Sequence, residues 1–109
     1  MTSAGMKFSK GDIVVINFPY SDLINAKKRP MLVLAERGED ILGCAITSNP
    51  ASEGVPITGF EEGNLPLQSK IKHWQINTFL KDLVIKKIAK IHKNAHKELL
   101  SKINELIKI

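Results

Sequence analysis

The residues best suited to chemistry on a charged substrate stand at the ends of two apolar runs. One run is preceded by three basic residues, Lys27, Lys28 and Arg29. A guanidinium can meet two phosphate oxygens with parallel hydrogen bonds, and Pro30 restricts the backbone at Arg29. The next apolar run ends on Thr47 and Ser48, whose hydroxyls can donate to the same group. The sequence predicts a polar pocket that Arg29 shares with these hydroxyls, although each segment also fits an ordinary turn.

A second group of polar side chains falls in the segment 67–78. Its members are Ser69, Lys72, His73 and Gln75, with Trp74 among them. The apolar residues Leu67, Ile71 and Ile76 break strict alternation, which predicts a strand with an irregularity near Trp74. The polar residues form a second candidate contact surface.

Three apolar runs must position the basic and hydroxyl residues. Each is rich in β-formers and bounded by Gly, Pro or Asp, which predicts strands at 12–18, 31–35 and 41–47. The first run is apolar without a break from Ile13 to Ile16, and this continuity is typical of a strand buried on both faces. Such a strand lies at the centre of a tightly curled sheet or barrel. The loop at 20–28 is nearly as long as the strands beside it, and loops of that length are often functional.

The rest of the chain predicts further strands and one clear helix. After the third strand we expect a short strand at 55–58, the irregular strand at 67–78, a helical turn at 81–84 and a lysine-rich strand at 86–91. Asn94 suits a helix N-cap. The apolar residues after it recur at helical spacing: Ala95, Leu99, Leu100, Ile103, Leu106 and Ile107. We expect this stripe to pack against the sheet, so the fold class is mainly β, of α+β type, with a C-terminal helix.

Size and composition indicate one domain over 1–109, with 1–6 as a loose N-terminal extension. The chain has 109 residues, 43% hydrophobic and 25% charged, which is enough for a core without metals or disulfides. Its single cysteine, Cys44, lies in an apolar run and is interpreted as a buried small residue in a reducing compartment. No segment approaches the ~18 apolar residues of a membrane span, and no signal peptide is evident. We therefore expect a cytoplasmic protein.

The charge and the missing motifs limit the kinds of partner and chemistry. A net charge of +5 favours a polyanion or an acidic protein, through steering and counterion release. The three histidines, His73, His92 and His96, lack a third ligand at suitable spacing, so no metal site is predicted. Gly-rich phosphate loops and the Gly-x-Ser-x-Gly elbow are absent, and no cofactor is expected. Acid–base chemistry must then come from Arg, Lys, Thr, Ser or His.

Four pieces of the sequence occur in an order and spacing that match a known family. They are Gly11-Asp12-Ile13-Val14, Phe18-Pro19, Lys28-Arg29-Pro30 followed by Leu32-Val33-Leu34, and Ala45-Ile46-Thr47-Ser48. Together they resemble the MazF/PemK (Kid) toxins of type II toxin–antitoxin systems. Ser69 to Ile71, Gln75-Ile76-x-Thr78 and the C-terminal helix also fit, so the likeness covers almost the whole domain.

The resemblance implies a small SH3-like β-barrel of the MazF/PemK/CcdB type with a C-terminal helix. Members form homodimers, are neutralised by an acidic antitoxin, and cleave single-stranded RNA without a metal. The 2′-hydroxyl attacks the adjacent phosphate and leaves a 2′,3′-cyclic phosphate and a 5′-hydroxyl. Carried over to this sequence, the motif arginine is Arg29 and the motif threonine is Thr47.

Further residues are expected to hold the RNA. Lys27 and Lys28 would attract its backbone, and Tyr20 and Trp74 would stack on unpaired bases or serve in ordinary packing. The residues expected to bond base edges or phosphates are Ser48, Ser69, Lys72 and Gln75.

The chain departs from some PemK-type relatives at Lys72-His73-Trp74, where those relatives have Arg-x-Asp with the Asp as base. Two explanations remain open: His73 takes the proton, or the chemistry depends on Arg29 and Thr47 alone. The lost carboxylate also keeps another function in view. The alternative is a non-catalytic toxin or RNA-binding module of the same fold, similar to the related toxin that blocks DNA gyrase by binding it.

Overall fold

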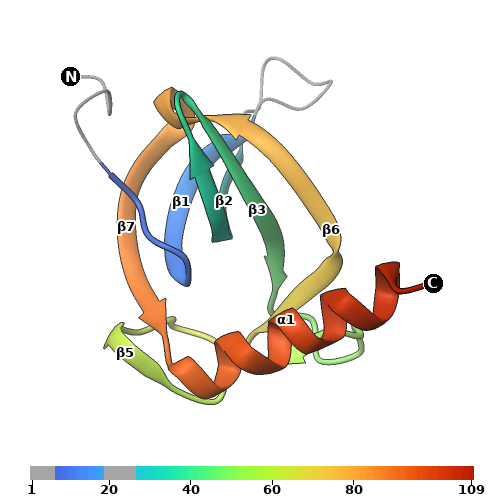
Figure 1. Ribbon diagram of the computed structural model, residues 1–109. Helices are drawn as coiled ribbons and strands as arrows, with labels where there is room; N and C mark the ends of the chain where they lie inside the picture. The colour runs from blue at the N-terminus through green and yellow to red at the C-terminus, as the bar shows by residue number, and fades with distance from the viewer. Residues whose placement is uncertain (1–6, 19–26) are drawn as a thin grey trace.

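The computed structural model describes residues 7–18 and 27–109, where the chain forms a curled antiparallel sheet and a long C-terminal helix (Figure 1). The elements are β1 (Asp12–Phe18), β2 (Lys27–Arg37), β3 (Asp40–Thr47), β4 (Val55–Pro56), β5 (Phe60–Gly63), β6 (Lys70–Leu80), the 3₁₀ turn η1 (Lys81–Leu83), β7 (Val84–Ile91) and α1 (Lys93–Ile107). The described strands lie in the order β4-β6-β3-β2-β1-β7-β5. The mainly β fold with a C-terminal helix is confirmed, while the predicted extension 1–6 and Tyr20 fall outside the described residues.

Strand β1 is buried on both faces, as its unbroken apolar run predicts. Ile13 belongs to a core cluster that includes Leu99 of α1, whereas Val14 and Ile16 belong to a second cluster on the opposite face. Cys44 is fully buried in the first cluster, and this burial raises the pKa of its thiol to about 11. The two clusters show that the curled sheet encloses one core and packs the helix against another.

Strand β2 starts earlier than the sequence indicates, so the predicted start at residue 31 is wrong. The strand begins at Lys27 and passes through Pro30, which pairs with Val15 of β1. A proline is tolerated in a strand at a position where no neighbouring strand needs a hydrogen bond from its backbone N–H. The pairing with β3 ends at Met31, so Pro30 lies beyond that ladder. The basic residues are therefore part of the sheet rather than of a loop.

Helix α1 also begins one residue before its predicted cap. His92 is the N-cap, and its Nδ1 accepts a hydrogen bond from the backbone N–H of Asn94 at 3.2 Å. An imidazole nitrogen replaces the side-chain oxygen that usually fills this role. The predicted cap at Asn94 is wrong, because Asn94 is already inside the helix.

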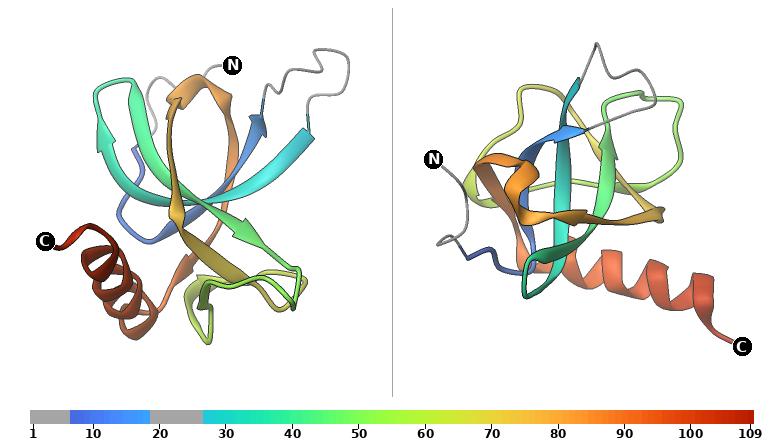
Figure 2. Two further views of the ribbon diagram at one scale, coloured as in Figure 1. Left: turned by 90° about the vertical axis from the view of Figure 1, so that its right-hand side faces the viewer. Right: turned by 90° about the horizontal axis from the view of Figure 1, so that it is seen from above.

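Only the first half of the helical stripe is buried. Ala95 and Leu99 are 2% and 0% exposed, whereas Leu106 and Ile107 are 52% and 70% exposed. The C-terminal half of α1 extends past the sheet (Figure 2, right). The expectation that the whole stripe packs against the sheet is therefore correct only for its N-terminal part. Neither described helix has the length and apolar character needed to cross a bilayer.

Candidate active site

Arg29 and Thr47 stand opposite each other where β2 and β3 separate. The two strands pair antiparallel through Met31 and Ala45, and extending this register by two residues sets Arg29 against Thr47. On its other side Arg29 pairs with Ile16 of β1. Both side chains line two adjoining pockets of about 260 and 220 Å³. Two residues distant in sequence thus share one small space.

The hydroxyl of Thr47 is held in place by the turn that follows it. Its Oγ1 accepts a hydrogen bond from the backbone N–H of Asn49 at 3.1 Å, and the side-chain Oδ1 of Asn49 accepts one from the backbone N–H of Ala51 at 3.0 Å. These bonds fix the oxygen but leave the hydroxyl hydrogen available for donation. Thr47 can therefore donate to a ligand in either adjoining pocket.

Three pockets meet at Thr47 and form what we call the Thr47 groove. The third, of about 430 Å³, continues from Thr47 past Pro50 and Pro56. The polar and charged side chains that line the groove are Lys28, Arg29, Thr47, Ser48, Asn49, Gln68, Ser69, Lys70, Lys72, Gln75 and Asn77. No Asp or Glu of the described chain lines any of the three pockets. The groove is thus a positively charged surface suited to an anion.

An irregularity in β6 decides which of its residues reach this groove. Cys44 pairs with Ile76 and Ile46 pairs with Ile71, so residues 72–75 stand opposite Ala45 alone. Such a bulge reverses the alternation of side chains along the strand. The irregularity predicted near Trp74 is confirmed. Ile71, just before the bulge, faces the core under the helix, while Lys72, the first residue of the bulge, lines the pocket with Arg29.

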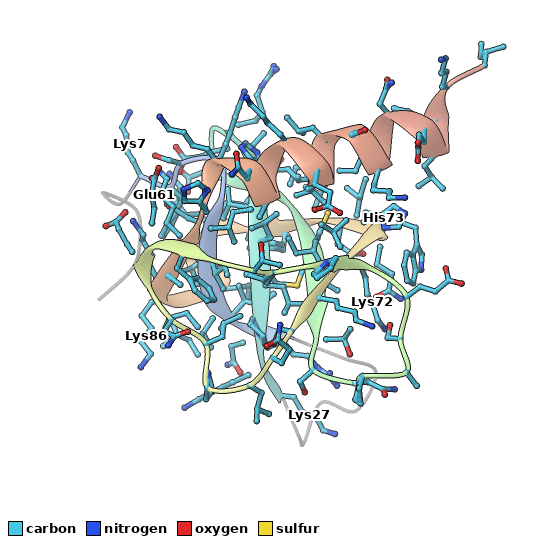
Figure 3. The ribbon with its side chains drawn as sticks, turned by 90° about the horizontal axis from the view of Figure 1, so that it is seen from below. Lys7, Lys27, Glu61, Lys72, His73 and Lys86 are labelled. Carbon is cyan, nitrogen blue, oxygen red and sulfur yellow. The ribbon has the colours of Figure 1, made fainter. Side chains whose placement is uncertain are left out.

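His73 lines a different pocket. This cavity, of about 540 Å³, lies between β6 and the C-terminal half of α1, and its other walls include Lys102, Glu105 and Leu106. Figure 3 shows His73 beside the helix and Lys72 farther from it, over the sheet. The His73 ring meets Trp74 edge to face at 5.2 Å between ring centres, and its buried Nδ1 has no hydrogen-bond partner among the described residues. The structure does not bring His73 to Arg29 and Thr47.

The remaining predicted residues have varied positions. Lys27 is exposed at the start of β2, and Trp74 is 40% exposed on the bulge. Ser69 is buried at the groove, where its Oγ donates to the carbonyl oxygen of Leu67 at 2.8 Å. Tyr20 lies outside the described residues.

Four polar residues of the groove are absent from the sequence prediction: Asn49, Gln68, Lys70 and Asn77. Asn77 lines the 220 Å³ pocket, and its spacing of two from Gln75 on a strand is the signal that could have revealed it. Lys70 lines the 430 Å³ pocket, and its Nζ donates to the carbonyl oxygens of Pro50 and Ser52 at 3.1 and 2.8 Å. These bonds fasten the loop after β3, a contact that no sequence pattern indicates.

The histidines are also spread apart. His92 caps α1, and burial, followed by the charges of Lys10 and Lys90, lowers the pKa of His96. Among residues 7–18 and 27–109, no three His, Cys, Asp or Glu side chains gather where they could hold a metal ion.

Comparison with known proteins identifies the family of this chain. A family model described as PemK-like, MazF-like toxin of type II toxin–antitoxin system matches residues 9–107. No curated protein matches the chain significantly.

Solved toxin structures share the fold. A MazE–MazF structure from Deinococcus radiodurans (Form-III) has a TM-score of 0.73 and 16% identity, covering 94% of this chain and 97% of that one. The Mycobacterium tuberculosis toxin MazF-mt6 has a TM-score of 0.69 and 14% identity, covering 90% and 97%. An endoribonuclease in complex with its cognate antitoxin from a mycobacterial species has a TM-score of 0.71 and 11% identity, covering 94% and 97%. Because the family model spans nearly the whole chain, the protein belongs to the PemK-like, MazF-like toxins of type II toxin–antitoxin systems.

Proposed function

We propose that the protein is a toxin endoribonuclease that cleaves single-stranded RNA without a metal ion. The observation that carries the proposal is the position of Arg29 opposite Thr47, in a groove that no described carboxylate lines. A phosphodiester in the 260 and 220 Å³ pockets would meet a guanidinium and a hydroxyl together. RNA is the substrate class because its 2′-hydroxyl supplies a nucleophile next to each phosphate.

The reaction needs stabilisation of charge more than a bound cofactor. The 2′-oxygen forms a bond to the adjacent phosphorus, and the bond from phosphorus to the 5′-oxygen breaks. The products are a 2′,3′-cyclic phosphate and a 5′-hydroxyl. Charge builds on the two non-bridging oxygens, to which Arg29 can donate two parallel N–H hydrogen bonds. Thr47 adds a third donor, so both residues bind the transition state better than the ground state.

The proton transfers are assigned without His73. Because His73 lines the pocket under α1, the open alternative that depends on Arg29 and Thr47 fits the geometry better. The 2′-hydroxyl passes its proton to water, and the 5′-oxygen, a strong base as it leaves, takes one from Arg29, which water then restores. Lys72 lies in the same pocket as Arg29 and holds the flanking backbone.

Two surfaces indicate the partners, the Thr47 groove and the exposed side of α1. An antitoxin with an acidic segment would occupy the Thr47 groove through charge complementarity and block RNA there. A second copy of the chain is the expected neighbour of α1, whose Leu100, Leu106 and Ile107 are half or more exposed. The proposed toxin acts in the cytoplasm, where messenger RNA is available.

The test is incubation of purified protein with a single-stranded RNA in EDTA, followed by analysis of the ends. We expect 2′,3′-cyclic phosphate and 5′-hydroxyl ends from the native protein and none from Arg29→Ala. Arg37→Ala, which removes an exposed arginine at the far end of β2, is the matched control and should cleave normally. Intact RNA with tight, salt-sensitive binding would instead support the non-catalytic RNA-binding module.

A further inference from the structure

Two amide side chains lie side by side on the wall of the 220 Å³ pocket. Gln75 and Asn77 are two residues apart on β6, so both point to the same face of the sheet. Asn77 pairs with Gly43, and extending that register sets Gln75 opposite Ala45. The amides thus stand opposite the two smallest residues of β3.

The small residues opposite the amides leave room for a flat ligand. Ala45 lines the pocket together with the two amides, and Arg29 and Thr47 line it as well. A volume of about 220 Å³ accommodates one nucleobase and not a base pair. A base in this space would be continuous with a phosphate at Arg29 and Thr47.

The amides remain available for such a ligand. Among the described residues, the side chains of Gln75 and Asn77 make no hydrogen bond, and both residues are exposed. Each amide offers a carbonyl acceptor beside an NH₂ donor. Such a group matches a base edge with a donor next to an acceptor, and adenine is the base that Asn and Gln bind bidentately in this way.

We propose that Gln75 and Asn77 form an adenine-reading subsite beside the scissile phosphate. Adenine fits two amides better than other bases do, because its exocyclic amine has a ring acceptor on each side, N1 and N7. One amide meets the Watson–Crick edge while the other meets the N7 edge. Guanine presents two acceptors at the latter edge and is not matched. The inference rests on the proposed function for its substrate class, but it concerns recognition rather than cleavage.

Binding of uncleavable ligands separates recognition from cleavage. The probes are 2′-deoxy pentanucleotides of A, C or U, measured by fluorescence anisotropy with the full-length protein. We expect the A pentamer to bind about tenfold more tightly than the others, within the range of one good bidentate pair. Asn77→Asp exchanges the NH₂ donor for an acceptor. It should abolish the preference, whereas its added charge should weaken all three ligands equally. Asn104→Asp makes the same chemical change on α1 and should leave the preference intact.

Sequencing the ends cut from a randomised RNA gives the second readout. Adenine should dominate one fixed position next to the cut, and Gln75→Ala or Asn77→Ala should flatten that position while cleavage continues. Cleavage with no adenine preference in the native protein would overturn the subsite and leave the proposed endoribonuclease standing. Adenine-selective binding without any cleavage would support the subsite and overturn the proposed function. Equal loss on all bases in Asn77→Ala would contradict a reading role.

Discussion

At the scale of single residues, the chemistry depends on which donors converge on one pocket. Arg29 brings a charge, and Thr47 brings a hydroxyl whose oxygen is already held by the N–H of Asn49. Neither needs a neighbouring carboxylate to be charged or to donate. The groove is therefore suited to stabilising a charged transition state. This stabilisation does not require a general base among the described residues.

Two substitutions of Thr47 test the roles of its hydroxyl and its methyl group separately. Thr47→Val should slow single-turnover cleavage roughly 10- to 150-fold, since a hydrogen bond to a charged group contributes about 1.5–3 kcal/mol. Thr47→Ser keeps the hydroxyl and should cleave within a few-fold of the native rate. A Val variant as fast as the Ser variant would remove Thr47 from the chemistry.

Lys72 and His73 are adjacent in sequence but should behave differently. Lys72→Gln should weaken RNA binding and reduce the slope of log affinity against log salt by roughly 0.7, the loss of one contact to a single-strand phosphate. His73→Gln should leave both the salt slope and the pH–rate profile unchanged, because its ring lines the pocket under α1. A pH–rate profile altered in His73→Gln would instead show that the histidine takes part in proton transfer.

At the scale of elements, the strands position the site and several of their bounds follow from local pattern. The sequence predicts β1 correctly and β3 to within one residue, because apolar runs and turn residues mark both. It does not predict that β2 extends back through Pro30, since only the pairing with β1, together with the end of the β3 ladder at Met31, shows that the missing N–H is harmless. It predicts the irregularity of β6. Which of Lys72 and His73 then faces Arg29 depends on the register with β3, a long-range property.

The contact between β5 and β7 depends on a glycine. Gly63 has φ +67°, and a Cβ there would overlap the carbonyl oxygen of Ile88 and lie 2.9 Å from the Cα of Ala89. Gly63→Ala should destabilise the protein by roughly 2–4 kcal/mol through backbone strain and overpacking. The matched control is Gly38→Ala, where φ is +59° but nothing lies within 4 Å of the added carbon. Its cost should be only the strain, about 1–2 kcal/mol, in urea unfolding. Equal losses would contradict the close approach.

At the scale of the whole molecule, an ion pair between a buried lysine and a partly buried glutamate joins several elements. Lys81 is 5% exposed, and its Nζ lies 3.0 Å from Oε1 of Glu36, which also accepts from the N–H of Phe8 at 3.1 Å. The hydrogen bond from Lys81, and then that from Phe8, lower the pKa of the Glu36 carboxyl. This arrangement joins β2, η1 and the segment before β1.

The lowered pKa of Glu36 gives acid sensitivity with a defined sign. A carboxyl with a depressed folded-state pKa stabilises the fold above its unfolded value, about 4.5, and loses this contribution as pH falls through the folded value. The free energy of unfolding should therefore decline below about pH 4.5 in the native protein. Glu36→Gln should be less stable at neutral pH and show a flatter acid limb. An unchanged acid limb in urea unfolding at several pH values would contradict this role.

The exposed end of α1 should control assembly. Ile107 is 70% exposed on the part of the helix that extends past the sheet, so Ile107→Lys should shift a dimer toward monomer in sedimentation experiments. Lys108→Ala, at the next position, is the control and should not change the oligomeric state measured by sedimentation. A native protein that is monomeric at all concentrations would exclude the second copy as the partner of this surface.

The central claim is that Arg29 and Thr47 act on one phosphate, and a double-mutant cycle measures this directly. Single-turnover cleavage would be compared for the native protein, Arg29→Lys, Thr47→Val and the double variant. If both donors contact the same group, the double variant should cleave faster than expected from multiplying the rate losses of the two single variants. The coupling free energy should be about 0.5–3 kcal/mol. Losses that simply multiply would mean that the two side chains act at separate places, and the proposed site would be wrong.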